Sequence, residues 1–188
     1  MVLASLPDGK EILVGGHKGG AVLALDPDRK GKLLWSEILG SKMASARGDI
    51  VFGGAVDHAA GYYALQENKG VASVDLKTGR ARWILHPDPP ADRQARVGSA
   101  AAVTVIPGVM LNGGWDGILR AYSTADGHEL WQYDTVKAFD TVNGVQAKGG
   151  SMGAPGAVVA GGMLFVGSGY IGTSNGMPGN VMLAFAPE

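Results

Sequence analysis

Residues 71–83 read VASVDLKTGRARW, and this segment decides the fold because it recurs along the chain. Residues 24–35 (ALDPDRKGKLLW) repeat it with one inserted residue, and residues 121–131 (AYSTADGHELW) repeat it without the insertion. A decayed fourth copy lies at residues 181–185. The three full copies end in tryptophans that are 48 residues apart. A fixed period of this length is typical of solenoids, arrays and propellers.

Each copy has the composition of a β-hairpin. A short apolar run leads to an Asp or Ser and a Gly-containing turn, and a second run ends in Trp. The glycine supplies the positive φ that such turns need, and the Asp or Ser side chain can hydrogen-bond the turn backbone. The indole can pack on the neighbouring repeat while its N–H bonds a main-chain acceptor. We therefore predict that Trp35, Trp83 and Trp131 clamp neighbouring repeats, although tryptophans that only fill a core would pack in much the same way.

The composition predicts a soluble all-β chain. The 188 residues include 31 glycines and only 18% charged residues, which favours short strands joined by tight turns. Basic and acidic residues are nearly balanced, 16 to 17, so no broad basic surface points to nucleic acid. The absence of cysteine excludes disulfides, thiolate metal sites and c-type haem attachment from this chain. We expect neither a signal peptide at the N-terminus nor a membrane span, because every apolar run is short.

The repeats fall at approximately residues 10–39, 40–88, 96–136 and 148–188. Each full repeat is expected to hold four antiparallel strands, and four-stranded sheets repeated radially are the blades of a β-propeller. The first repeat is expected to lack its opening strand and the last to lack its Trp strand. The prediction is an all-β partial propeller of about three and a half to four blades. Further blades or a second copy would complete the ring.

Two segments are longer than the repeat requires. Residues 55–70 add extra positions to the second repeat, and residues 137–150 form a long connection before the last strands. Insertions in repeat proteins collect on one face, often the binding face. Residues 99–106 are instead β-branched and alanine-rich, which suits a strand close to the propeller axis. The two long segments therefore mark the expected binding face.

The repeat resembles the tryptophan-docking motif of quinoprotein dehydrogenases, Ala-x-Asp-x-x-x-Gly-x-x-x-Trp in its looser form. The matching positions are Ala24, Asp26, Gly31 and Trp35, then Asp75, Gly79 and Trp83, then Ala121, Gly127 and Trp131. The chain departs from the motif at Ser73 and Ser123, which replace Ala and Asp. The motif also fits the non-enzymatic propeller scaffold of outer-membrane protein assembly, so it leaves two classes of function open.

The last third of the chain carries a more specific resemblance. Residues 139–151, 161–166 and 176–185 resemble the C-terminal end of polyvinyl-alcohol-dehydrogenase-like proteins. The resemblance implies an eight-bladed propeller that binds pyrroloquinoline quinone with Ca²⁺ and oxidises secondary alcohols, either small molecules or polymers. It also implies that electrons pass to cytochrome c in the periplasm. The family's haem motif and vicinal cysteines are absent here, so this segment alone is expected to be inactive.

The resemblance also suggests which residues would contact the quinone. The cofactor has three carboxylates, for which Arg and Lys are natural partners. Arg96 and Lys148 occupy equivalent places, just before Gly98-Ser99 and Gly150-Ser151. Trp115 is the tryptophan outside the docking register. We predict that Trp115, Arg96 and Lys148 line the channel near the quinone; solvated charges at its lip and a packing Trp are the alternative.

No residue is singled out as a catalytic base or Ca²⁺ ligand. Asp116, Asn143 and Asn180 carry suitable oxygen donors, but Asp and Asn in Gly-rich turns are usually turn formers. The four histidines, His17, His58, His86 and His128, show no metal-ligand spacing. The competing interpretations are therefore a segment of a quinone-dependent alcohol dehydrogenase and a propeller scaffold that binds other proteins without a cofactor.

Overall fold

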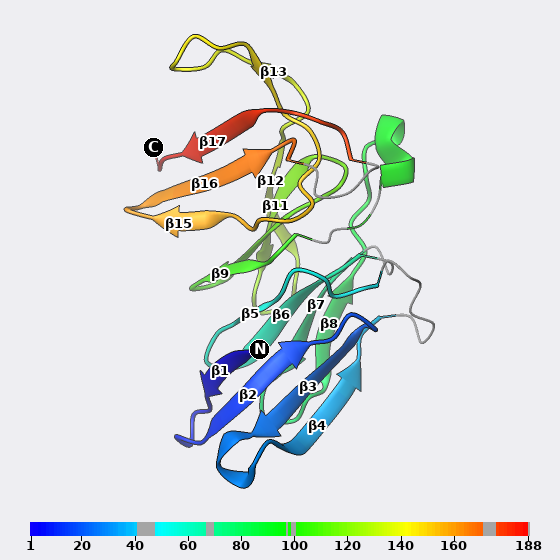
Figure 1. Ribbon diagram of the computed structural model, residues 1–188, viewed down its shortest axis with the longest axis vertical. Coiled ribbons are helices and arrows are strands. Elements are labelled where there is room, and N and C mark those ends of the chain that lie inside the picture. The colour runs from blue at the N-terminus through cyan, green and yellow to red at the C-terminus, as the bar shows by residue number, and fades with distance from the viewer. Residues whose placement is uncertain (41–47, 67–69, 97, 99–100, 171–175, 188) are drawn as a thin grey trace.

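The computed structural model describes residues 1–40, 48–66, 70–96, 98, 101–170 and 176–187. Within them the chain forms three four-stranded antiparallel sheets, one three-stranded sheet and a two-stranded hairpin (Figure 1). The predicted all-β partial propeller is confirmed. The elements are β1 (Val2–Ser5), β2 (Glu11–Gly16), β3 (Ala21–Asp26), η1 (Pro27–Arg29), β4 (Lys32–Ile38), β5 (Ala55–Val56), β6 (Ala60–Leu65), β7 (Gly70–Asp75), β8 (Ala81–Leu85), η2 (Ala91–Arg96), β9 (Thr104–Ile106), β10 (Val109–Gly113), β11 (Ile118–Ser123), β12 (Glu129–Asp134), β13 (Ala138–Phe139), β14 (Ala147–Lys148), β15 (Val158–Ala160), β16 (Met163–Ser168) and β17 (Val181–Phe185).

The first sheet has the opening strand that the sequence was expected to lack. β1 pairs antiparallel with β2, and Ala4 lies opposite Ile12 on the buried face. A tight turn joins the two strands: Leu6 N donates to Lys10 O (2.8 Å), and Gly9 has a φ of 82°. The prediction was wrong because β1 has only four residues, too few to show an alternating pattern.

The prediction that residues 55–70 add extra positions to the second repeat is also wrong. The described residues of this stretch include β5, β6 and the first residue of β7, which are regular strands of the second sheet. Every residue of β6 is buried, with Tyr62 and Tyr63 on opposite faces. Residues 50–54, just before β5, lie in the connection between the first and second sheets.

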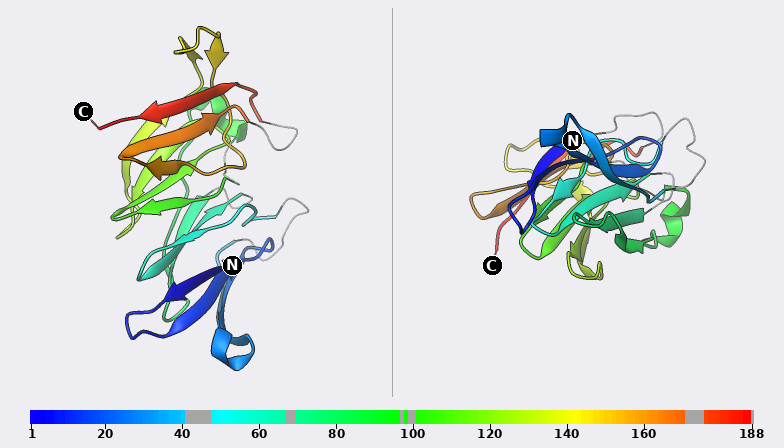
Figure 2. Two further views of the ribbon diagram at one scale, coloured as in Figure 1. Left: turned by 60° about the vertical axis from the view of Figure 1, so that its left-hand side comes forward. Right: turned by 90° about the horizontal axis from the view of Figure 1, so that it is seen from below.

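The third and fourth sheets follow the predicted order with shorter strands. The expected strand at residues 99–106 is reduced to β9, and Ser99 and Ala100 lie outside the described residues. The long connection at residues 137–150 carries the β13–β14 hairpin, which projects from the body (Figures 1 and 2). The last sheet holds β15, β16 and β17, so β17 is an edge strand among the described residues.

The apolar cores lie between neighbouring sheets, which stack from the N-terminal to the C-terminal end of the molecule (Figure 2). Side chains alternate between the faces of a strand, so the second sheet contributes to two cores. Tyr63 and Val74 pack toward the first sheet, whereas Tyr62 and Val71 pack toward the third. This face-to-face contact of successive sheets is the arrangement of propeller blades.

The outer face of the first sheet carries a row of leucines in cross-strand register. Leu3 pairs with Leu13, Leu13 with Leu25, and Leu25 with Leu33. Leu3 is 53% exposed and Leu33 is 55% exposed, because no sheet among the described residues covers this face. The first and last sheets therefore each present one uncovered apolar face, and Met182 is exposed on the last.

The connections between sheets meet the turns between second and third strands along one side of the stack. Asp49, in the first connection, donates its N–H to Lys18 O in the β2–β3 turn (2.8 Å). Trp115, in the β10–β11 turn, donates its N–H to Gly98 O in the second connection (3.0 Å). Connections and turns thus converge on the side of the stack where Trp115 lies, which we call the converging end.

Candidate functional site

The turn of residues 114–117 between β10 and β11 is held on all sides. Each of its four carbonyls accepts a hydrogen bond from another segment. The pairs are Met152 N to Gly114 O, Ser151 Oγ to Trp115 O, Arg93 Nη1 to Asp116 O, and Thr135 N and Oγ1 to Gly117 O. Buried backbone groups are normally paired in this way. The turn therefore presents Trp115 in a fixed backbone conformation.

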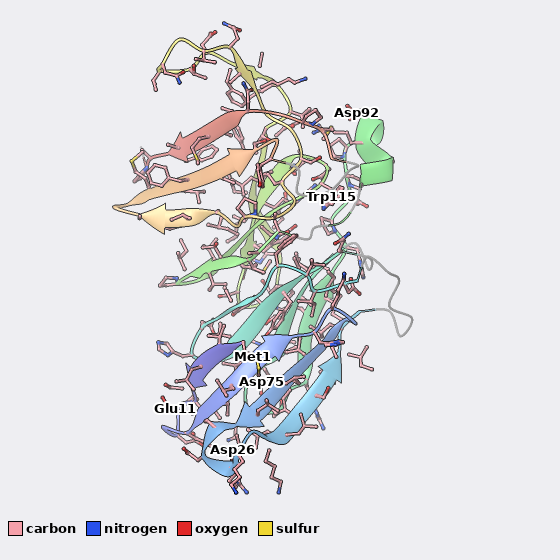
Figure 3. The ribbon with its side chains drawn as sticks, in the orientation of Figure 1. Met1, Glu11, Asp26, Asp75, Asp92 and Trp115 are labelled. Atoms are coloured by element: carbon pink, nitrogen blue, oxygen red, sulfur yellow. The ribbon has the colours of Figure 1, made fainter. Side chains whose placement is uncertain are left out.

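The indole of Trp115, unlike the carbonyls of the turn, lacks a hydrogen-bond partner in the described part of the chain. Its Nε1 is buried and has no hydrogen-bond partner among the described residues. Buried indole N–H groups normally find an acceptor. Gly153 flanks the ring, and a Cβ at that position would lie 3.7 Å from it. Figure 3 places Trp115 at the same end of the sheets as η2, where Asp92 is labelled. A donor without a partner in a fixed turn is the strongest sign of a ligand contact in this region.

Asp116, a candidate oxygen donor, is occupied by a buried ion pair. Arg120 Nη2 lies 2.6 Å from Asp116 Oδ2, and both side chains are 5% exposed. Asp116 Oδ1 also accepts from Ile118 N (3.1 Å) and Arg120 Nη1 (3.2 Å). Burial would lower the pKa of Arg120, but the hydrogen bonds and charge of Asp116 raise it overall. Asp116 thus supports the Trp115 turn, as the turn-former interpretation of Asp residues implies.

Arg93, which sequence reasoning missed, links three segments of this end. Its guanidinium contacts both carboxylate oxygens of Asp134, at 3.0 Å and 2.5 Å, and donates to Asp116 O at 2.7 Å. The same ion pair lowers the pKa of Asp134. Arg93 lies in η2, within a Pro-rich linker, and its partners are 41 and 23 residues away. No local pattern in the sequence could have indicated them.

Arg96 lies at the last position of η2, and its side chain is outside the described part of the chain. Its backbone is close in sequence to Gly98, whose carbonyl accepts a hydrogen bond from the main-chain N–H of Trp115. The structure therefore brings the segment of Arg96 to the Trp115 turn.

Lys148 ends β14, and its residue is exposed. Its backbone pairs with Asn180: Lys148 N donates to Asn180 Oδ1 (3.0 Å), and Asn180 N donates to Lys148 O (2.9 Å). A shallow pocket of about 450 Å³ lies here, lined by Gln146, Ala147, Lys148, Pro178, Gly179 and Asn180. No hydrogen bond links Lys148 to Trp115 within the described residues. Lys148 therefore lines a neighbouring hollow at the base of the β13–β14 hairpin.

Two further candidate donors, Asn143 and His128, make local contacts within turns. Asn143 Oδ1 accepts from Thr141 Oγ1 and Val145 N at the hairpin tip. His128 Nδ1 lies 2.7 Å from Asp126 Oδ1 in an exposed turn. In the part of the chain that the structure describes, no three His, Cys, Asp or Glu residues group together to hold a metal ion.

The three repeat tryptophans have unequal surroundings. Trp35 Nε1 donates to Leu76 O (3.0 Å), and Trp83 Nε1 donates to Thr124 O (3.5 Å), each to the next sheet. Trp131 instead stacks on Tyr133, with a centroid distance of 5.9 Å, and meets Phe185 edge-on at 5.5 Å. Trp131 is 39% exposed.

Comparison with known sequences shows a protein family that the chain matches. Residues 2–172 match the PQQ_2 family, described as outer membrane protein assembly factor BamB. Polyvinylalcohol dehydrogenases from a Pseudomonas species and from Sphingopyxis sp. (strain 113P3) are 36% and 35% identical to the chain. Each comparison covers 100% of this chain but only 32% of the relative. The chain thus spans about a third of the length of these curated relatives.

Solved structures give the same fold. A quinohemoprotein alcohol dehydrogenase from Pseudomonas putida HK5 matches with a TM-score of 0.64 and 21% identity, covering 84% of this chain and 27% of that one. The quinohemoprotein alcohol dehydrogenase from Comamonas testosteroni matches with a TM-score of 0.58 and 17% identity, over 94% and 30%. BamB from Moraxella catarrhalis matches with a TM-score of 0.55 and 16% identity, over 89% and 42%.

The family match spans most of the chain, and the identity to the polyvinylalcohol dehydrogenases extends over all of it. The propeller sheets of the structure agree with both findings. The chain therefore belongs to the PQQ_2 family of repeat proteins and is a polyvinyl-alcohol-dehydrogenase-like member of it.

Proposed function

We propose that this chain forms part of the propeller of a pyrroloquinoline quinone-dependent alcohol dehydrogenase that acts on a small or polymeric alcohol. The observation that supports this most is the 36% identity to a polyvinylalcohol dehydrogenase over the whole chain. Solved quinohemoprotein alcohol dehydrogenases share the fold, which is consistent with the proposal. Because the chain spans 32% of its relatives, other blades would be needed for the complete site.

The residues at the converging end fit contacts to a quinone cofactor. The unpartnered Trp115 N–H is a donor for an oxygen of the ligand, and its ring offers a flat stacking surface. Lys148 is an exposed cation that suits a carboxylate, and the segment of Arg96 adjoins the Trp115 turn. We propose that these three residues hold the cofactor, with Trp115 as the central contact.

The fit to a metal ion is weaker. The carboxylate of Asp116 is engaged by Arg120, and Asn180 is engaged by the backbone of Lys148. With no acidic or histidine cluster among the described residues, a Ca²⁺ accompanying the quinone would take its ligands from elsewhere in the longer protein. No base for the alcohol is assigned to this chain.

When bound, the quinone would supply the two-electron acceptor for alcohol oxidation. This chain would contribute orientation: the fixed turn sets the Trp115 ring, and the charged side chains set the carboxylates. Prior fixation of such groups lowers the entropic cost of reaching a reactive geometry. We further propose that Trp35, Trp83 and Trp131 hold neighbouring blades together. We also propose that cytochrome c accepts the electrons and that the protein acts in the periplasm. In the described residues, no helix has the length and apolar character needed to cross a membrane.

The test is a matched pair of variants in the full-length protein that carries this chain. Trp115→Phe keeps an aromatic ring but removes the N–H, whereas Trp131→Phe makes the same change at a site distant from the turn. We expect Trp115→Phe to weaken quinone binding roughly tenfold, and Trp131→Phe to leave it unchanged. Dye-coupled alcohol oxidation with added quinone and Ca²⁺ measures activity, and absorbance after dialysis measures retained quinone. Absence of both signals in the full-length protein would contradict the proposed function.

A non-enzymatic propeller scaffold remains the second candidate, and one structural feature favours it. The β13–β14 hairpin projects from the body (Figure 2). Val142 and Val145, between its two strands, are exposed. Such an exposed apolar pair suits contact with another protein. The family description and the match to Moraxella catarrhalis BamB are in keeping with this candidate. If the full-length protein binds no quinone, and Val142→Asp abolishes its association with a partner, the scaffold is supported.

A further inference from the structure

We propose that Arg93 is a positioning residue for Trp115, acting through the backbone of the turn that carries the indole. This inference rests on the proposed function, because it assigns to Arg93 the task of fixing a cofactor contact. Arg93 touches neither the ring nor any expected reacting group. Its contribution would be to hold the turn in the conformation that a flat ligand requires.

The geometry of Arg93 is that of a brace across the third sheet. Its guanidinium spans from η2 to the end of β12, where it meets both oxygens of Asp134. The same Nη1 donates to Asp116 O, the carbonyl next to Trp115. The Arg93 side chain is only 10% exposed although Asp134 is 48% exposed, so the brace is covered by the protein on the arginine side.

Arg120 holds the same turn from its other side. It is paired with the Asp116 carboxylate and also donates Nη2 to Asp88 O (3.3 Å), in the connection that leads to η2. Arg93 thus holds the main-chain oxygen of Asp116, and Arg120 holds its side chain. Since Asp116 follows Trp115 directly, displacement of either contact would tilt the indole.

Arginine is needed at position 93 for a geometric reason. Its planar fork can meet two carboxylate oxygens and one carbonyl together, whereas a lysine ammonium is a point charge at the end of a flexible chain. Lysine would keep the charge near Asp134 but lose part of the three-way contact. Arg93→Lys should therefore restore only part of what Arg93→Gln removes.

A second arginine in the chain provides a matched control. Arg29 Nε pairs with Asp26 Oδ2 at 2.8 Å in the first sheet, which lies at the opposite end of the stack from the third and fourth sheets (Figure 1). Arg29→Gln removes one arginine–aspartate pair without touching the Trp115 turn. Any effect shared by the two variants is general stability, and any effect confined to Arg93→Gln reports the turn.

The experiment measures hydrogen exchange of the Trp115 amide, which donates to Gly98 O, in the 188-residue chain and its variants. We expect exchange to be about tenfold faster in Arg93→Gln, less affected in Arg93→Lys, and unchanged in Arg29→Gln. Titration of the full-length protein that carries this chain with pyrroloquinoline quinone should show a matching loss of affinity, roughly tenfold in Arg93→Gln, smaller in Arg93→Lys and absent in Arg29→Gln.

The two readouts separate the inference from the proposed function. If the wild-type chain and the full-length protein bind no quinone, the proposed function fails, while the exchange data still decide whether Arg93 fixes the turn. If Trp115 exchange in Arg93→Gln equals that in Arg29→Gln, the positioning role is wrong even when quinone binds. If Arg93→Gln speeds Trp115 exchange but leaves quinone affinity intact, the turn is braced but Trp115 is not a cofactor contact, which also overturns the inference.

Discussion

The junction between the first and second sheets and the junction between the third and fourth use the same repeat tryptophan in different ways. At the first junction, the Trp35 ring lies over Gly79, and its indole N–H donates to Leu76 O in the turn after β7. At the last junction, Trp131 meets Phe185 of β17 and stacks on Tyr133 of its own strand. The junction in the middle resembles the first, because Trp83 lies over Gly127.

The difference shows that the repeat motif specifies only half of a junction. The other half is a glycine turn at the same place in the next sheet, which an indole can cover. At the last junction, Trp131 meets the side chain of Phe185 in β17, and Trp131 stays 39% exposed.

The largest effect is expected from adding a methyl group beneath a seated indole. Gly79→Ala would place a Cβ 2.6 Å from the Trp35 ring, whereas Gly31→Ala would meet nothing closer than Leu25 at 4.0 Å. Both glycines have a positive φ, 76° and 72°, so the backbone strain is matched at about 1 kcal/mol. We expect Gly79→Ala to lower the free energy of unfolding by about 3 kcal/mol, because overpacking adds to strain. Urea denaturation of the two variants measures the difference, and equal losses would mean that the indole contributes nothing at this junction.

The next effect is the loss of the indole hydrogen bond. Trp35→Phe leaves Leu76 O without its donor, and we expect a cost about 1 kcal/mol above that of Trp131→Phe. Trp131 serves as the control, since no hydrogen bond of its Nε1 occurs among the described residues. Thermal and urea unfolding of both variants provide the measurement. A larger loss for Trp131→Phe would reverse the ranking of the two junctions.

A gain is expected at the junction between the second and third sheets. Ser73 Oγ is buried without a partner in the described part of the chain, and Ala24 and Ala121 occupy the equivalent position. Ser73→Ala should stabilise the chain by about 1 kcal/mol, because it removes an unsatisfied hydroxyl. Ser123→Ala is the contrast, since Ser123 Oγ accepts from Ala125 N (3.2 Å). A stability loss in Ser73→Ala would indicate a water or ligand partner for the hydroxyl.

The smallest effect at neutral pH concerns Tyr62, on the same junction. Burial, the hydrogen bond to Asp57 and its charge raise the pKa of Tyr62 from 10.0 to about 12. A folded-state pKa above the unfolded value means that the stabilisation is complete below pH 10.0 and is lost as pH rises toward about 12. We expect the ultraviolet phenolate titration of the wild type to contain a component near pH 12 that Tyr62→Phe lacks. Its appearance near pH 10.0 would contradict this environment.

Much of the fold could be predicted from the sequence because the motif is local. Residues 71–83 and their copies carry the turn glycine and the tryptophan within a dozen positions, and the hairpins β3–β4, β7–β8 and β11–β12 lie where the copies are. β1 and the strands within residues 55–70 were missed, because short or fully apolar strands lack an alternating pattern. Tertiary contacts between sheets, rather than local preference, fix these strands.

The candidate site was less accessible to sequence reasoning. Trp115 could be singled out as the tryptophan outside the repeat register, but its unpartnered N–H depends on side chains far away in sequence. Arg93 carried no signal, since its contacts to Asp116 and Asp134 cross 23 and 41 residues. Whether Trp115, Arg96 and Lys148 bind a quinone stays a prediction, which the variants described above test.

The leucine row on the first sheet has a consequence for handling the isolated chain. A continuous apolar strip crosses the four strands and consists of Leu3, Leu13, Leu25 and Leu33. Attraction between such strips strengthens on warming, because water release drives it and its heat-capacity change is large. Concentrated samples should therefore scatter more light at room temperature than in the cold, and Leu13→Glu should keep them clear.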